Sequence, residues 1–222
     1  MRSLSLVEEI VLFCLDRRAQ RFKGNDQTYK ELYTIGSVFI ELWLKELIQI
    51  NEDGKVRLDH SYSTGVDYLD QVIQVISESP KEKTIKKWIT SFYYKRKDRK
   101  KIYQTILMDL CQVGVVREEN ARLLGVFSRQ IFVGSGQEQE RTVRRIRAEL
   151  LGNSTVEKQT VALSLFLKEM RVLKEYFSNH DMNRLKEKMK ELKQDEVFQW
   201  IKGIEKAITA IKASAHSHTP VM

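Results

Sequence analysis

The 222-residue sequence has only two prolines and two cysteines, and its apolar residues form no long uninterrupted run. The longest apolar run near the start, residues 10–15, is far shorter than the roughly 20 residues that span a bilayer. Glu8 and Glu9 precede it, whereas a signal peptide needs a cationic start and an acid-free apolar stretch. We therefore exclude a transmembrane helix and a disulfide-rich secreted domain, and expect a cytoplasmic protein.

Motifs that carry catalysis are also lacking. The sequence has no glycine-rich phosphate loop, dinucleotide fingerprint, HExxH or GxSxG. Cys14 and Cys111 are isolated among apolar residues, which favours buried inert thiols over metal or redox roles. His216 and His218 stand beside Pro220 without further ligands and fit a solvated tail. We expect no enzyme, no metal and no cofactor.

What the sequence does have is a sizeable apolar fraction and a concentrated positive charge. With 42% hydrophobic and 31% charged residues, it is typical of a soluble globular protein. Residues 81–101 contain ten basic and two acidic residues, which alone account for the net charge of +8. If solubility were the only demand, interspersed acids would reduce the self-repulsion of such a segment. We infer an anionic partner, with a solvated charged face as the alternative.

Apolar residues at helical spacing, preceded by N-capping patterns, predict a mostly α-helical chain. The expected helix starts are Ser5, Thr28, Thr64, Ser79 and Ser154. The start at Ser79-Pro80 opens a helix with Lys83, Lys86 and Lys87 outward. The helix from Val161 is apolar nearly all round, which predicts that it runs through the centre of a bundle.

Two segments predict β-hairpins. Residues 47–50 and 55–58 alternate around a turn-rich tetrad, and residues 115–133 contain two apolar stretches that look like strands. We therefore expect a single-domain helical bundle over residues 1–212, wrapped by amphipathic helices and with one or two short β-hairpins. Residues 213–222 are expected to form a flexible tail.

The candidate binding cations lie on two expected helices. A helix from about Asp98 places Lys97, Lys100 and Lys101 on a shared polar stripe, and Gly114 stands where its C-cap belongs. A later helix carries arginines three and four residues apart on one face. The candidate binding residues on the two helices are Lys97, Lys100, Lys101, Arg96, Arg144 and Arg145, with Arg141 beside the last two.

Two kinds of anionic partner fit these clusters. Tyr93, Tyr94 and Tyr103 interleave with the cations, and a helix that feeds a hairpin resembles a winged-helix reader of nucleic acid. Alternatively, the cations bind anionic phospholipid headgroups, with nearby apolar side chains entering the membrane interface. A third hypothesis is a protein–protein scaffold that acts through the second hairpin.

Six stretches of the sequence, in this order, carry a resemblance to a known family. They are LSLVEEIVL (residues 4–12), GSVFIELWL (36–44), TGVDYLD (64–70), TIKKWI (84–89), LCQVGVV (110–116) and the apolar helix from Val161. Together they resemble the Golgi phosphoprotein 3 family of peripheral membrane proteins, which has bacterial members, over roughly residues 4–211. The arginine-bearing N-terminal tail of eukaryotic members does not precede Leu4, so we expect a bacterial-type member.

The resemblance implies binding of phosphatidylinositol 4-phosphate at a shallow basic pocket, no catalysis, and a location on the cytosolic face of a membrane. It also implies that the hairpin at 115–133 protrudes for membrane insertion or for self-association into a homo-oligomer. The candidates for its tip are Leu123, Leu124, Val126 and Phe127, with inward packing as the alternative.

The headgroup pocket that the resemblance implies consists of one Trp and three Arg. The matching positions here lie near Gly24 and at Ile35, Lys100 and Tyr103, so one of the four keeps a cation. A lysine is a point charge that lacks the bidentate fork of arginine. We therefore expect general attraction to anionic lipid more than recognition of one phosphoinositide.

Overall fold

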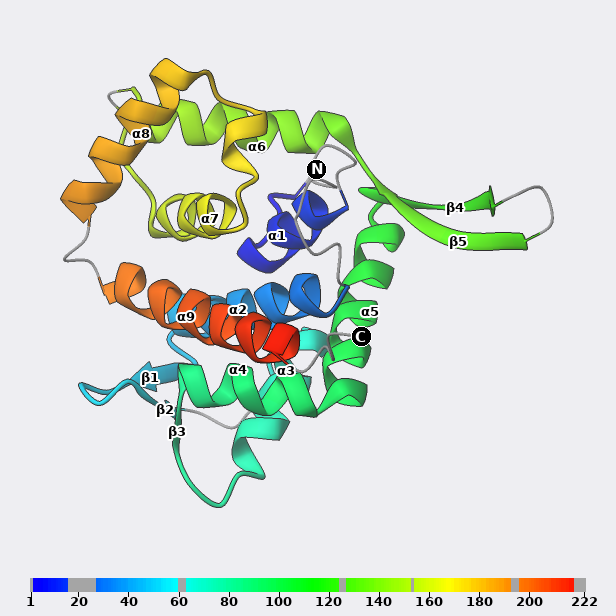
Figure 1. Ribbon diagram of the computed structural model, residues 1–222, viewed down its shortest axis with the longest axis vertical. Coiled ribbons are helices and arrows are strands. Elements are labelled where there is room, and N and C mark those ends of the chain that lie inside the picture. The colour runs from blue at the N-terminus through cyan, green and yellow to red at the C-terminus, as the bar shows by residue number, and fades with distance from the viewer. Residues whose placement is uncertain are drawn as a thin grey trace.

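The computed structural model describes residues 2–15, 27–59, 63–123, 127–152, 154–192 and 196–217. Most of these residues are helical, and their strands form two small antiparallel sheets (Figure 1). The helices are α1 (Leu6–Cys14), α2 (Gln27–Leu44), α3 (Asp67–Ser77), α4 (Ile85–Tyr94), α5 (Arg96–Gln112), α6 (Gly136–Leu150), α7 (Lys158–Glu169), the 3-10 helix η2 (Leu173–Glu175), α8 (Asn179–Glu191) and α9 (Glu196–Ser217). The strands are β1 (Ile48–Ile50), β2 (Lys55–Leu58), β3 (Lys83–Thr84), β4 (Val116–Leu123) and β5 (Phe127–Gly134). The predicted mostly α fold with short hairpins is confirmed.

Helix α2 lies at the centre of the bundle. All of its residues from Glu31 to Leu42 are buried, and it packs against α1, α4, α5, α7 and α9. Gly36 permits a close approach of α9, because a Cβ there would lie 2.7 Å from Cγ2 of Ile204. Close-packed interiors leave no room for such an atom unless a neighbour moves. A glycine at position 36 therefore brings α2 and α9 together.

Helix α7 also runs through the core, as its apolar sequence predicts. Residues 160–167 are all buried, and α7 packs against α1, α2, α6 and α9. The expected capping box at Ser154 is wrong: the N-cap of α7 is Glu157, without a side-chain cap bond, and its N–H donates to Glu149. The box at Ser5 is confirmed, with Ser5 and Glu8 exchanging both cap bonds.

Strands β1, β2 and β3 form one antiparallel sheet beside α4. The first hairpin is as predicted, and Gly54 in its loop adopts a φ of 71°, a left-handed conformation that glycine enters without steric cost. The expected helix start at Ser79 is wrong. Lys83 and Thr84 instead pair with Val56 and Lys55 of β2, and Thr84 then caps α4.

The start of α3 also differs from the prediction. Its N-cap is Val66, without a side-chain cap bond, and α3 begins at Asp67. The Thr64 hydroxyl and N–H both donate to the Asp70 carboxylate, at 2.7 and 2.8 Å. Asp70, rather than the expected Asp67, is therefore the carboxylate that bonds to Thr64 in the loop before α3.

The second hairpin, β4–β5, projects from the bundle at the end of α5 (Figure 1). Its strands pair antiparallel in register, from Val116 opposite Gly134 to Leu123 opposite Phe127. Gly114 ends α5 with a φ of 72°, as its position in the sequence predicts. At the other end of the chain, α9 continues to Ser217, into the stretch expected to be a tail. Among the described residues, none of the helices is long and apolar enough to span a membrane.

Candidate functional site

Arg99 fixes the orientation of α5. Its side chain is only 2% exposed, and Nε donates to Oε2 of Glu31 on α2 at 2.7 Å. Nη1 donates to the carbonyl oxygens of Phe92 and Tyr93 at 2.9 and 2.7 Å, in the last turn of α4. These carbonyls have no partner within their own helix, so Arg99 satisfies them while its charge is paired. One cation of the basic segment is therefore part of the core.

The predicted lysine stripe lies on the opposite face of α5. Lys97, Lys100 and Lys101 are all exposed, as is Arg96 beside them. We call these three lysines the α5 basic stripe. Asp98 is 3.8 Å from Lys95, and the sequence has no other carboxylate before Asp109. Positive charge is therefore concentrated on the solvent face of the first half of α5.

Exposed apolar side chains occur close to this stripe. Among the described residues, the large hydrophobic side chains classed as exposed are Tyr94 (78%), Met108 (49%) and Val113 (42%). Met108 lies seven residues after Lys101, about two helical turns along the same face. Cations and apolar groups thus share the outer side of one helix.

A shallow pocket of about 230 Å³ lies between α3 and α5. Lys95 and Lys101 line it together with Glu78 and Asp98, so its cations face carboxylates at close range. Gln71 donates to the Thr105 hydroxyl at 3.1 Å across the two helices. A pocket of mixed charge is a poor site for an anion, and Lys97 and Lys100 lie outside it.

The arginines of α6 do not form one free cluster. Arg144 is exposed, whereas Arg145 is partly buried and donates to Oε2 of Glu9 at 2.8 Å. The other oxygen of Glu9 accepts from Thr142 at 2.9 Å. Burial raises the pKa of Glu9, which Arg145 opposes. In Figure 1, α6 crosses the top of the molecule, away from the lower end of α5, at which that helix begins.

The positions that match the headgroup pocket of the resembled family are mostly buried or not described. Ile35 is fully buried in α2, and Tyr103 is buried on the inward face of α5. Lys100 is exposed about one helical turn before Tyr103, and residue 24 lies outside the described residues. A pocket with the arginine forks that the resemblance implies is therefore not assembled from these positions.

The hairpin candidates lie partly beyond the described structure. Leu123 and Phe127 pair as the last residues of β4 and the first of β5, while residues 124–126 and the side chains of 120–130 lie outside what the structure describes. Arg117, Glu118 and Glu119 of β4 are exposed.

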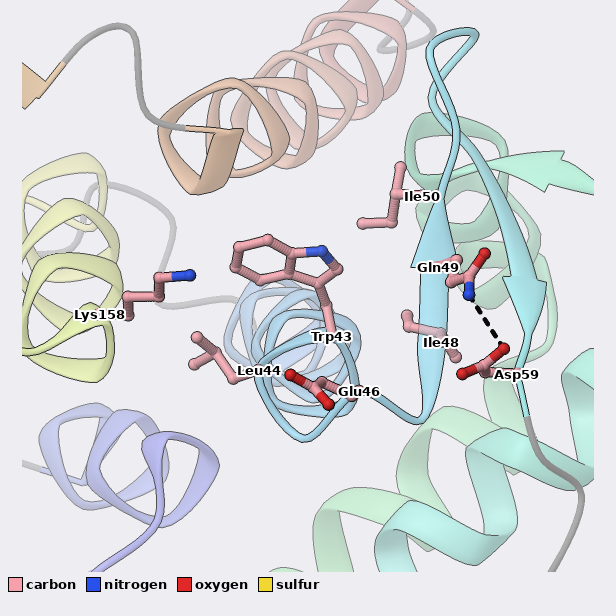
Figure 2. Close-up of a pocket in the computed structure, with 8 residues that line it drawn as sticks. All are labelled: Trp43, Leu44, Glu46, Ile48, Gln49, Ile50, Asp59 and Lys158. Atoms are coloured by element: carbon pink, nitrogen blue, oxygen red, sulfur yellow. Dashed lines mark hydrogen bonds between the residues drawn. The ribbon is translucent and has the colours of Figure 1, made fainter.

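Sequence reasoning missed a second pocket, of about 440 Å³, at the end of α2 (Figure 2). Its wall includes Trp43, with Nζ of Lys158 5.5 Å from the ring centroid. Residues from positions 43–50, 59 and 158 meet there, and no local spacing in the sequence signals such a site.

The end of α2 at this pocket is strained. The Leu47 N–H donates to the Leu42 carbonyl at 2.9 Å and the Glu46 N–H to the Trp43 carbonyl at 3.0 Å, which is a Schellman motif. Its left-handed position, with a φ of 58°, is held by Glu46. Glycine adopts this conformation freely, whereas another residue pays about 1 kcal/mol. α7 ends in the same motif with Arg171, at a φ of 60°.

Comparison with known proteins identifies one family. The family model described as Golgi phosphoprotein 3 (GPP34) matches residues 6–211, nearly the whole chain. No curated protein matches this sequence.

Proposed function

Because the chain belongs to the Golgi phosphoprotein 3 family, we propose that it is a non-enzymatic peripheral membrane protein that binds anionic phospholipid headgroups through the α5 basic stripe. The observation that carries the proposal is the solvent face of α5, where Lys97, Lys100 and Lys101 are exposed and Met108 follows on the same side. The membrane would be met on its cytosolic face, where anionic lipids concentrate.

The energetics of such a surface are additive and electrostatic. Each lysine close to an anionic bilayer contributes about 1 kcal/mol, so the stripe contributes about 3 kcal/mol, or about a hundredfold in affinity. Salt screens this attraction over a Debye length of about 8 Å at physiological ionic strength. Met108 and Tyr94 add apolar area that is independent of salt.

Selectivity follows from the kind of cation present. Lysine ammonium groups are point charges, and Arg99, whose fork would suit a phosphate, is committed to Glu31 and to the end of α4. With Ile35 and Tyr103 buried as well, the surface supports selection by charge density. We propose that a phosphoinositide binds here as an anionic lipid, without a stereospecific pocket.

Vesicle sedimentation tests the proposal. The full chain is mixed with phosphatidylcholine vesicles, and with vesicles that also contain phosphatidylserine or, at matched total charge, phosphatidylinositol 4-phosphate. We expect pelleting on both anionic mixtures and little on phosphatidylcholine alone. The triple variant Lys97→Glu, Lys100→Glu, Lys101→Glu should lose at least the hundredfold above, about 3 kcal/mol, with a Tm close to that of wild type.

The matched control is Lys186→Glu, Lys190→Glu, Lys206→Glu, which makes the same charge change at exposed positions of α8 and α9. Equal loss in the two triple variants, or equal pelleting on neutral and anionic vesicles, would contradict the proposal. Tighter binding to phosphatidylinositol 4-phosphate than to phosphatidylserine at matched charge would contradict the proposal that the surface selects lipids by charge density. Retention of duplex DNA at low salt, lost in the α5 variant, would instead favour the winged-helix hypothesis.

A further inference from the structure

The pocket at the end of α2 has the form of a small-molecule site. It lies between the end of α2, strand β1 and the start of α7 (Figure 2). Its volume of about 440 Å³ falls within the range of roughly 300–1,000 Å³ that is common for ligand pockets. Leu44, Ile48 and Ile50 supply apolar lining beside Trp43, which is half-buried and presents its ring to the cavity.

The face of Trp43 is a position that a cation occupies. Lys158 comes from the first residue of α7 and points its ammonium group toward the indole, 5.5 Å from the ring centroid. The negative face of an indole attracts ammonium groups, tryptophan most strongly among the aromatic residues. Lys158 is otherwise exposed and forms no salt bridge with a described carboxylate, so its side chain is free to turn into solvent.

Two carboxylates also line the pocket. Glu46 lines the pocket and forms no salt bridge with a described cation. Asp59 lies on the side of β1, where one of its oxygens accepts from Nε2 of Gln49 at 3.0 Å. Among the described residues, Glu46 balances the charge of Lys158 in the lining, and the face of Trp43 is what favours a cationic ligand over an anionic one.

The strained backbone of Glu46 is a second, independent observation. A left-handed glutamate persists where glycine would be more stable, and strain of this kind gathers at binding sites. Arg171 has the same strain at the end of α7 but does not line the pocket. The comparison of the two positions separates the effect of strain from the effect of the carboxylate.

We propose that this pocket binds a small organic ammonium ion. Its charge lies over the Trp43 ring, in the place that Lys158 occupies in the structure, and the Glu46 carboxylate belongs to the same pocket lining (Figure 2). Its apolar part packs against Leu44, Ile48 and Ile50. The site is separate from α5, and its occupancy is independent of whether the protein binds membranes.

Isothermal titration calorimetry on the full chain tests the charge preference. The probes are hexyltrimethylammonium and hexanoate, which share a six-carbon chain and differ in the sign of their charge. We expect saturable binding of the cation and binding of hexanoate at least about tenfold weaker, since one cation–π contact contributes on this scale. Equal affinity for both probes, or no binding of the cation, would overturn the proposal.

Four variants test the geometry. Trp43→Leu should weaken binding of hexyltrimethylammonium about tenfold. Glu46→Gly should weaken it several-fold while relief of strain raises the Tm by roughly 2–4 °C. The matched control Arg171→Gly should raise the Tm similarly and leave the affinity unchanged. Lys158→Ala should strengthen binding, because it removes the competing ammonium group. Weaker binding in Lys158→Ala, or unchanged affinity in Glu46→Gly, would also overturn the proposal.

Discussion

At the scale of single residues, buried carboxylates hold the N-terminal helix in place. Glu41 of α2 accepts from the Val7 N–H and from the Tyr68 hydroxyl, both at 3.0 Å. The Val7 N–H lies in the first turn of α1 and has no partner within its own helix. Burial raises the pKa of Glu41, although these hydrogen bonds oppose the shift. The carboxylate thus caps α1 at a cost that depends on pH.

This cost predicts a pH dependence for Glu41→Gln. Because the pKa of Glu41 is higher in the folded than in the unfolded chain, ionisation destabilises the folded protein. The cost is absent below the ordinary pKa of 4.5 and fully present above the raised one. Glutamine resembles the protonated acid, so the Tm of Glu41→Gln relative to wild type should be higher at pH 7 than at pH 4. Thermal unfolding by circular dichroism at both pH values measures this difference.

The surface variant Glu187→Gln controls for the change of net charge, since Glu187 is exposed on α8. The difference between its Tm and the Tm of wild type should remain small at both pH values. If Glu41→Gln showed the same Tm difference at pH 4 and pH 7, the buried carboxylate would not be the titrating group.

At the scale of secondary-structure elements, Arg99 joins three helices. It lies on α5, pairs with Glu31 of α2 and satisfies the end of α4. Arg99→Met would leave the Glu31 carboxylate buried without its partner. Removing one member of a buried ion pair costs about 3–5 kcal/mol, so we expect a loss of this size in urea unfolding. The neighbouring variant Lys100→Met should change the free energy of unfolding by less than about 0.5 kcal/mol.

The double variant Glu31→Leu, Arg99→Met should recover part of the loss, because apolar groups of similar volume replace the pair. A free energy of unfolding of Arg99→Met within about 1 kcal/mol of wild type would show that the pair does not hold α5.

The elements also show which features can be predicted from sequence. The inward positions of α5, including Ile102, Ile106 and Leu110, repeat at helical spacing, and this spacing places the lysines outside. The same period includes Arg99, three residues before Ile102, so its burial was foreseeable from position though not from residue type. The start of α4 was not foreseeable, because β3 pairs with residues 55 and 56, far away in the sequence.

The candidate sites divide in the same way. The α5 basic stripe is local and follows from spacing within one helix. The Trp43 pocket needs the end of α2, the hairpin β1–β2 and the first residue of α7 at once, so it is a product of tertiary packing. Glu46 gives no signal in the sequence either, since glutamate rarely marks a left-handed helix end.

At the scale of the whole molecule, the second hairpin continues the chain outward from the C-terminal end of α5 (Figure 1). α5 leads through Gly114 into β4, and the hairpin projects outward from that end of the bundle (Figure 1). An isolated two-stranded hairpin is only marginally stable in water. Apolar side chains at its end are stabilised when they are buried against a membrane or a second hairpin. Leu123 and Phe127 are paired across the strands nearest that end.

We expect the hairpin to mediate self-association in solution. Wild type should show a monomer–dimer equilibrium in sedimentation velocity over a dilution series. Phe127→Glu should weaken the dimer at least about tenfold, because a charge in an apolar contact must be desolvated without a partner. The control Asn120→Glu adds the same charge to the hairpin at a position paired with Gln130. The dimer dissociation constant of this control should remain closer to that of wild type. A wild-type chain that stays monomeric at every concentration would contradict the prediction.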